Sequence, residues 1–152
     1  MSIDFTEESQ RAHDRLIAYW QKLRGERLYP EETDIDTQAI ADLWGSCFLL
    51  NTQKQTGDAF KYELMGPAII EAYGADLTGK VASQKLEPHV KSIKESVANV
   101  LKNQHYTIDE NEFMNTHGQL VKYRACLVPF GNAPLEVKYI LGLMRWRFDE
   151  AK

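Results

Sequence analysis

The segment VKYILGLMRW, residues 137–146, restricts the fold of this chain more than any other stretch. Its residues are almost continuously apolar, whereas a strand with one face in water alternates apolar and polar side chains. Such a run is expected for a strand in the centre of a sheet, where both faces are covered. The chain must therefore provide one layer of structure for each face of this strand.

The hydrophobic pattern predicts helices and strands that do not alternate regularly along the chain. Apolar residues at helical spacing predict helices over residues 7–24, 37–44, 68–73 and 89–103. Short apolar or alternating runs predict strands over residues 47–51, 59–65, 105–115, 120–130 and 136–148. This order argues against a parallel, doubly wound sheet, because such sheets need a helix between successive strands.

Length and charge limit the class of protein. A chain of 152 residues fits one domain that can bury a core without disulfides or metals. The net charge of -4 gives no general attraction to a nucleic-acid backbone. No apolar run has the length of a membrane span, and the acidic start MSIDFTEESQ differs from a signal peptide. We therefore expect a cytoplasmic protein with no nucleic-acid or membrane partner.

The cysteines and histidines do not form a metal-binding pattern. Cys47 and Cys126 lie in strand-like runs without CxxC spacing, so we expect two reduced and buried thiols. The histidines are scattered, with no pair at ligand spacing on one helix: His13, His89, His105 and His117. The sequence therefore predicts no metal site.

The stretch GADLTGK, residues 74–80, has the glycine and lysine spacing of a phosphate-binding loop. Such a loop also needs a strand before it, a helix after it, and Ser or Thr after the lysine to hold magnesium. Here Val81 follows Lys80, and the preceding AIIEAY has the pattern of a helix. The sequence therefore predicts no phosphate-loop nucleotide site.

The same stretch closes a longer motif, FKYELMGPAIIEAYGADLTGK, residues 60–80. A strand is followed by Pro-Ala, a short apolar helix, Gly74 and then Leu-x-Gly-Lys at residues 77–80. This order resembles the turn region of a PAS domain. One difference is Gly66, which stands where many PAS domains have an Asn that fixes the next helix.

The N-terminal part extends this resemblance over nearly the whole chain. Its motif residues are Tyr19-Trp20, Leu23-Arg24-Gly25, Arg27, Pro30 and Asp34-Ile35-Asp36, with Thr37 where a Pro is expected. They are similar to the opening of a family of short bacterial proteins made of one PAS domain. The resemblance implies an N-terminal helical extension, residues 1–46, followed by a PAS domain, residues 47–148.

The resemblance implies an α+β fold with a five-stranded antiparallel sheet in the strand order second, first, fifth, fourth, third. The fifth strand, residues 136–148, is then central, as its apolar run requires. The helical middle would cover one face of the sheet and the N-terminal helices the other. Alternatively, the N-terminal helix pairs with its copy in a second chain and forms a homodimer.

The resemblance also allows cofactors to be considered. A flavin photoreceptor of this type carries an Asn-Cys-Arg-Phe run in its helical middle, and this sequence has none. A haem sensor places a histidine on the long helix, whereas His89 lies at the very start of the predicted helix, beside Pro88. We therefore expect no flavin and no haem.

The resemblance implies a non-catalytic sensor that recognises a small molecule or a signalling protein. No nucleophile–base signature is present, so we expect no catalytic residue. The candidate ligand-binding residues combine apolar area with polar tips, or lie on the long helix: Tyr62, Tyr73, Ile93, Val97, Tyr123 and Tyr139. The alternative, that each tyrosine is a core residue with a satisfied hydroxyl, fits the same pattern.

Two other classes of function compete with the sensor. One is an enzyme with a cone-shaped α+β fold, which would need Tyr139 and a carboxylate such as Glu63 in one pocket. The alternation in residues 59–65 directs Glu63 away from the face of Phe60 and Tyr62, which ranks the enzyme lower. The other is a dimerisation module with a filled pocket and no ligand.

Overall fold

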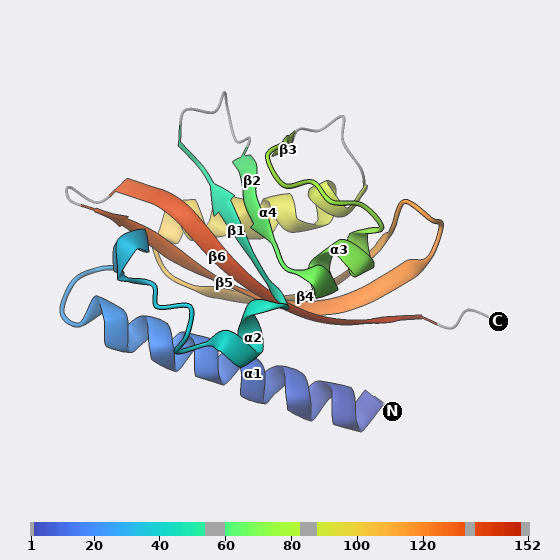
Figure 1. Ribbon diagram of the computed structural model, residues 1–152, viewed down its shortest axis with the longest axis horizontal. Helices are drawn as coiled ribbons and strands as arrows, with labels where there is room; N and C mark the ends of the chain where they lie inside the picture. Colours follow the sequence, from blue (N-terminus) through green and yellow to red (C-terminus); the bar gives the residue numbers. More distant parts are fainter. Residues whose placement is uncertain (1, 54–59, 83–87, 133–135, 150–152) are drawn as a thin grey trace.

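The computed structural model describes residues 2–53, 60–82, 88–132 and 136–149. Its helices are α1 (Ser2–Arg24), the 3-10 helix η1 (Glu32–Asp34), α2 (Ala41–Trp44), α3 (Pro67–Tyr73) and α4 (Pro88–Asn103). Its strands are β1 (Cys47–Asn51), β2 (Phe60–Met65), β3 (Val81–Ala82), β4 (Thr107–Met114), β5 (Leu120–Asn132) and β6 (Glu136–Phe148). Helices lie on both sides of a single twisted sheet (Figure 1).

The strands form one antiparallel sheet in the order β3-β2-β1-β6-β5-β4. The five longer strands follow the predicted order, with β6 in the centre between β1 and β5. The two-residue strand β3 was not predicted, and it extends the sheet beyond β2. The α+β fold with a five-stranded antiparallel sheet is therefore confirmed, with one short strand added at its edge.

The two faces of β6 contribute to two separate hydrophobic cores. Ile140 and Met144 belong to the core on the side of α3 and α4, which we call the inner face. Leu141 and Leu143 belong to the core on the side of α1 and α2, which we call the outer face. The alternation shows why the run over residues 137–146 is apolar throughout, since each face of the central strand is buried.

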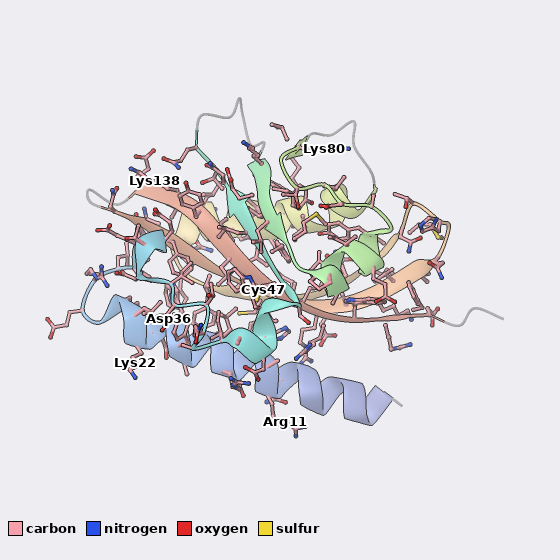
Figure 2. All side chains as sticks on the ribbon, in the orientation of Figure 1. Arg11, Lys22, Asp36, Cys47, Lys80 and Lys138 are labelled. Carbon is pink, nitrogen blue, oxygen red and sulfur yellow. The ribbon has the colours of Figure 1, made fainter. Side chains whose placement is uncertain are left out.

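α1 covers the outer face through a single apolar stripe. Leu16 and Trp20 have no exposed surface, and the indole Nε1 of Trp20 donates a hydrogen bond to the carbonyl of Pro129 at 2.7 Å. On the opposite side of the helix, Arg11 and Lys22 point away from the sheet (Figure 2). Trp20 thus anchors α1 in the outer core, and Trp44 is partly buried against the same core.

The helix predicted over residues 37–44 is shorter in the structure. Residues 37–40 form a turn, and α2 begins only at Ala41. The carboxylate of Asp36 accepts a hydrogen bond from the backbone N–H of Gln38 at 3.0 Å. This local bond favours a turn over a helix start, so Asp36 caps the turn and not the helix.

The stretch over residues 74–80 does not have the arrangement of a phosphate loop. α3 precedes it and β3 follows it, the reverse of the strand and helix that such a loop needs. Gly74 ends α3 with a φ of 82°, a left-handed conformation that glycine adopts without strain. Asp76 Oδ1 then accepts the backbone N–H of Thr78 at 3.0 Å, which closes the turn.

The two cysteines are free and buried on the outer face. Cys47 on β1 and Cys126 on β5 both lie opposite Leu143 of β6, so a whole strand separates them. This placement agrees with the predicted strand order. Burial raises the pKa of each thiol to about 12, which keeps both in the unreactive protonated form at neutral pH.

Replacing Val97 by Asp should destabilise the protein by several kcal/mol. The side chain is 1% exposed in the inner core, and an unpaired charge would be buried there. The neighbouring Ala98 is exposed, so Ala98→Asp serves as a matched control with a change of less than about 1 kcal/mol. Urea denaturation measures both, and equal stabilities of the two variants would show that α4 does not pack in this register.

Deleting residues 1–25 should make the chain aggregate. The deletion uncovers the apolar outer face of the sheet, including Phe130, Leu141 and Leu143, none of which has exposed surface in the full chain. Light scattering on the full and truncated chains measures the effect. A truncated chain that stays soluble, with unchanged association state, would show that α1 is dispensable for covering the sheet.

Candidate functional site

Five of the six predicted ligand-binding residues lie together on the inner face. They are buried in the core between the sheet and the helices α3 and α4: Tyr62, Tyr73, Ile93, Val97 and Tyr123. The sixth, Tyr139, lies on the outer face, partly buried against the core that α1 covers. Its predicted grouping with the other five was wrong, because odd-numbered residues in this part of β6 face outward.

Aromatic rings form a continuous row through this inner core. Successive rings contact one another edge-on or at a tilt, with centroid separations of 5.6 Å for Phe60–Tyr62, 6.1 Å for Tyr62–Tyr73, 5.4 Å for Tyr73–Phe113 and 5.6 Å for Phe113–Tyr123. Phe113 was missed by the sequence reasoning, although the period-two pattern of its strand could have identified it. The row links β2, α3, β4 and β5.

The hydroxyl of Tyr62 is the polar group that this core leaves unsatisfied. Its oxygen is buried and makes no hydrogen bond of good geometry to a described residue, although the Tyr73 hydroxyl lies near enough for a hydrogen bond between the two phenols to act on the pKa of each. Burial raises the pKa of Tyr62, and it raises the pKa of Tyr73 as well, so both phenols are neutral. A buried hydroxyl without a partner costs about 1–3 kcal/mol.

A buried asparagine fixes the end of α3 beside this row. Asn115 Nδ2 donates to the carbonyl of Ala72 at 3.2 Å, and its Oδ1 accepts the backbone N–H groups of His117 and Gln119 at 2.9 Å each. The backbone N–H of Thr116 also donates to the carbonyl of Tyr73 at 3.1 Å. The turn between β4 and β5 is therefore bonded directly to the residue that carries a ring of the row.

Glu63 takes no part in the inner core. Its carboxylate accepts a hydrogen bond from Asn51 Nδ2 at 2.9 Å, while Phe60 and Tyr62 on the same strand belong to the inner core. The expected orientation of Glu63 away from these two rings is confirmed. The pairing of Tyr139 with Glu63 on the inner face, which an enzyme would need, is not formed.

A family model for the PAS domain matches residues 8–145. The chain belongs to the PAS domain family. PAS domains are generally sensory, non-catalytic modules of signalling proteins, and this chain is accordingly a domain of the sensor class. A comparison with curated proteins found no match.

Solved structures share the fold at low sequence identity. A light-oxygen-voltage (LOV) domain studied with a flavin analogue is 14% identical, covers 74% of this chain and 84% of its own, and has a TM-score of 0.54. A LOV protein from Rhodobacter sphaeroides is 12% identical over 74% of this chain and 68% of its own, with a TM-score of 0.53. The PAS-B domain of Drosophila melanogaster Cycle with bound glycerol is 14% identical over 66% and 98%, with a TM-score of 0.50.

The inner face carries neither cysteine of the chain. The sequence lacks the Asn-Cys-Arg-Phe run, and its two cysteines lie on the outer face. The side chain of His89, weighed above as a haem ligand, lies outside the described residues. In the described part of the chain, no group of three possible metal ligands occurs and no helix is long and apolar enough to cross a membrane.

A polar pocket lies on the outer face. It has a volume of about 330 Å³ and is lined by Gln10, His13 and Asp14 of α1, Ile108 of β4 and Arg124 of β5. His13 is 1% exposed, and neither nitrogen of its ring has a hydrogen-bond partner. The sequence reasoning missed this residue, because it stands inside the helical stripe between Ala12 and Leu16.

The surroundings of His13 favour its neutral form. Burial first, and then the charges of Arg124 and Arg145, lower the pKa of His13 from 6.5 to about 4. The nearby carbonyl groups of Leu143 and Arg124 act in the opposite direction and favour protonation, but they do not outweigh burial. The imidazole is therefore neutral at physiological pH.

Stability should fall as the pH drops from about 6.5 to about 4. The folded protein resists protonation of His13 in this window, whereas the unfolded chain accepts the proton. Protonation therefore stabilises the unfolded state relative to the folded state. The shift corresponds to a loss of about 3 kcal/mol that is complete near pH 4. Denaturant unfolding at several pH values measures it in the wild type and in His13→Leu, which cannot titrate. Parallel pH dependence in both proteins would contradict this role of His13.

Proposed function

We propose that this chain is a non-catalytic sensor module that recognises a small molecule on its inner face. The ligand would lie among Tyr62, Tyr73 and Tyr123, with Ile93 and Val97 of α4 as the opposite wall. The support comes from the family and from the aromatic row, which offers large apolar area with polar tips.

The observation that carries this proposal is the buried hydroxyl of Tyr62, which makes no hydrogen bond of good geometry and has only the Tyr73 hydroxyl beside it. A phenol that is buried only for packing could be a phenylalanine, which would avoid the cost of an unsatisfied polar group. A ligand with a hydrogen-bonding group beside Tyr62 would satisfy this hydroxyl. The proposal therefore assigns Tyr62 as the polar contact that orients the ligand, and the neighbouring rings as apolar contacts.

The hydrogen bonds around Tyr73 offer a way for ligand binding to change the surface of the protein. The Tyr73 ring belongs to the aromatic row, and its carbonyl accepts the N–H of Thr116 in the turn between β4 and β5. A ligand that displaces the Tyr73 ring would change the position of this turn. We propose that a signalling protein reads this change at the surface.

An enzymatic function is less well supported. Among the described residues near the inner face, the buried polar side chains are Ser96 and Asn115, and both are engaged. Ser96 Oγ donates to Asp109 Oδ2 at 2.5 Å, and no histidine or lysine accompanies this pair in the described core. General acid–base chemistry needs such a group within hydrogen-bond reach of the substrate.

The partners proposed for the chain are a small molecule, a signalling protein and a second copy of the chain, in the cytoplasm. The apolar stripe of α1 is occupied by the sheet, so a homodimer would use the exposed side of α1 or an edge of the sheet. The net charge of -4, with acidic residues outnumbering basic ones, argues against a nucleic-acid partner. Analytical ultracentrifugation measures the association state.

Comparing the native and denatured masses of freshly purified protein tests for a bound small molecule. In the ligand-free protein, Tyr62→Phe should raise the free energy of unfolding by about 1 kcal/mol, because it removes an unsatisfied hydroxyl. The same change should weaken binding of any ligand found by about tenfold. Tyr139→Phe on the outer face is the matched control for both measurements.

A loss of stability in ligand-free Tyr62→Phe would show that the hydroxyl is already bonded within the protein. That result, together with identical native and denatured masses, would overturn the proposed ligand site. The inner core would then be a filled core, as in a dimerisation module without ligand.

A further inference from the structure

The pocket on the outer face is built by three elements that the chain brings together from distant positions. α1 contributes Gln10, His13 and Asp14, while β4 and β5 contribute Ile108 and Arg124. β4 is the edge strand of the sheet, and its Glu110 lies directly opposite Arg124 on β5. The pocket therefore lies where the first half of α1 crosses the edge of the sheet, on the face opposite the aromatic row.

His13 gives this pocket a polar group that nothing in the described structure satisfies. A neutral imidazole has one N–H donor and one acceptor nitrogen, and both atoms here are buried without a hydrogen bond of good geometry, although the carbonyl groups of Leu143 and Arg124 lie near the ring. Arg145 on β6, whose charge acts on His13, also has a buried Nε–H without an acceptor. The His13 donor requires an acceptor, which a water or a ligand in the pocket can supply, whereas Arg145 does not line the pocket and acts on His13 through its charge.

The charges that face His13 are mainly positive. Arg124 and Arg145 are the charged residues that act on it, from β5 and β6. Arg124 donates its Nε–H to Glu110 at 2.9 Å, and Glu110 is largely exposed, whereas the Arg124 side chain is 20% exposed. Arg145 donates to Ser46 Oγ at 2.8 Å and forms no ion pair with a described residue, although its charge reaches Asp42 and lowers the pKa of that carboxyl. Arg145 therefore adds an unshared positive charge behind this partly exposed pocket, which favours an anion beside His13.

The remaining lining limits the kind of anion. Ile108 is 46% exposed, and its side chain offers an apolar contact to a carbon skeleton in the pocket. Asp14 is exposed, forms no ion pair with a described residue, and would repel a second negative charge on the ligand. An ammonium group on the ligand would instead be attracted to Asp14.

From this arrangement we infer that the outer pocket is a binding site for a small aliphatic monocarboxylate. Its carboxylate accepts hydrogen bonds from His13 and Arg124, and its carbon chain packs against Ile108. A ligand that also carries an ammonium group gains a contact with Asp14. This site is separate from the inner-face site proposed above, and neither depends on the other.

Three probes of similar shape separate these contributions. They are 4-methylpentanoate, which has only the carboxylate, leucine, which has both charged groups, and 3-methylbutylamine, which has only the ammonium group. At neutral pH, 4-methylpentanoate and leucine should shift the NMR signals of the His13 ring in a saturable way, and 3-methylbutylamine should not. Asp14→Asn should weaken leucine binding several-fold without weakening that of 4-methylpentanoate.

Arg124→Gln tests the assigned carboxylate contact. It should weaken 4-methylpentanoate binding by about tenfold, the usual effect of losing one charged hydrogen bond. Lys122→Gln is the matched control, because Lys122 precedes Arg124 by two residues on the same strand, carries the same charge and does not line the pocket. His13→Asn, with His117→Asn as its exposed control, should abolish binding while circular dichroism confirms that the variant is folded.

Several outcomes would overturn the inference. They are an absence of saturable shifts with both carboxylates, equal binding of 3-methylbutylamine, or equal effects of Arg124→Gln and Lys122→Gln. If His13→Asn does not fold, the comparison of Arg124→Gln with Lys122→Gln still decides, because both positions lie on the partly exposed surface of β5.

Discussion

The burial of β6 on both faces is the constraint on which the rest of the structure depends. Its alternating side chains enter two separate cores, so neither layer of helices can be removed without exposing apolar surface to water. Gly142, in the middle of this strand, lies opposite Phe48 of β1. A Cβ atom at Gly142 would come within 2.2 Å of the Phe48 ring, so the absence of a side chain there lets the ring fill the inner core.

The sheet therefore separates two environments that differ in chemistry. The inner core contains a row of aromatic rings, and the outer pocket combines the imidazole of His13 with the guanidinium of Arg124. On β5 these environments are one residue apart, since Tyr123 faces the inner row and Arg124 faces the outer pocket. A movement of β5 caused by contacts on one face of the sheet consequently also moves the side chain that it carries on the other face.

Much of this fold follows from hydrophobic periodicity, and the parts that do not have identifiable physical reasons. The ends of β1 and β6 agree with the predicted ranges, because both strands are strongly apolar. The same continuous apolar run hides which residues of β6 face inward, and Tyr139 was assigned to the wrong face for this reason. β3 has only two residues and carries no pattern. His13 occupies a core position in a helical stripe, and only the fold shows that arginines surround it.

The attachment of α1 differs between its two halves. Near its C-terminal end, Trp20 is fully buried and its N–H is satisfied by Pro129, so this part is held by apolar area and a complete hydrogen bond. In the N-terminal half of α1, His13 is buried and neither ring nitrogen makes a hydrogen bond of good geometry. This lowers the stability of the packing between α1 and the sheet, and an occupant of the pocket that bonds to His13 would restore it. Occupancy of the outer pocket, or protonation of His13, therefore acts on the first half of α1 while Trp20 retains the second. α1 is in this way both the cover of the outer face and the element whose position a ligand on that face can change.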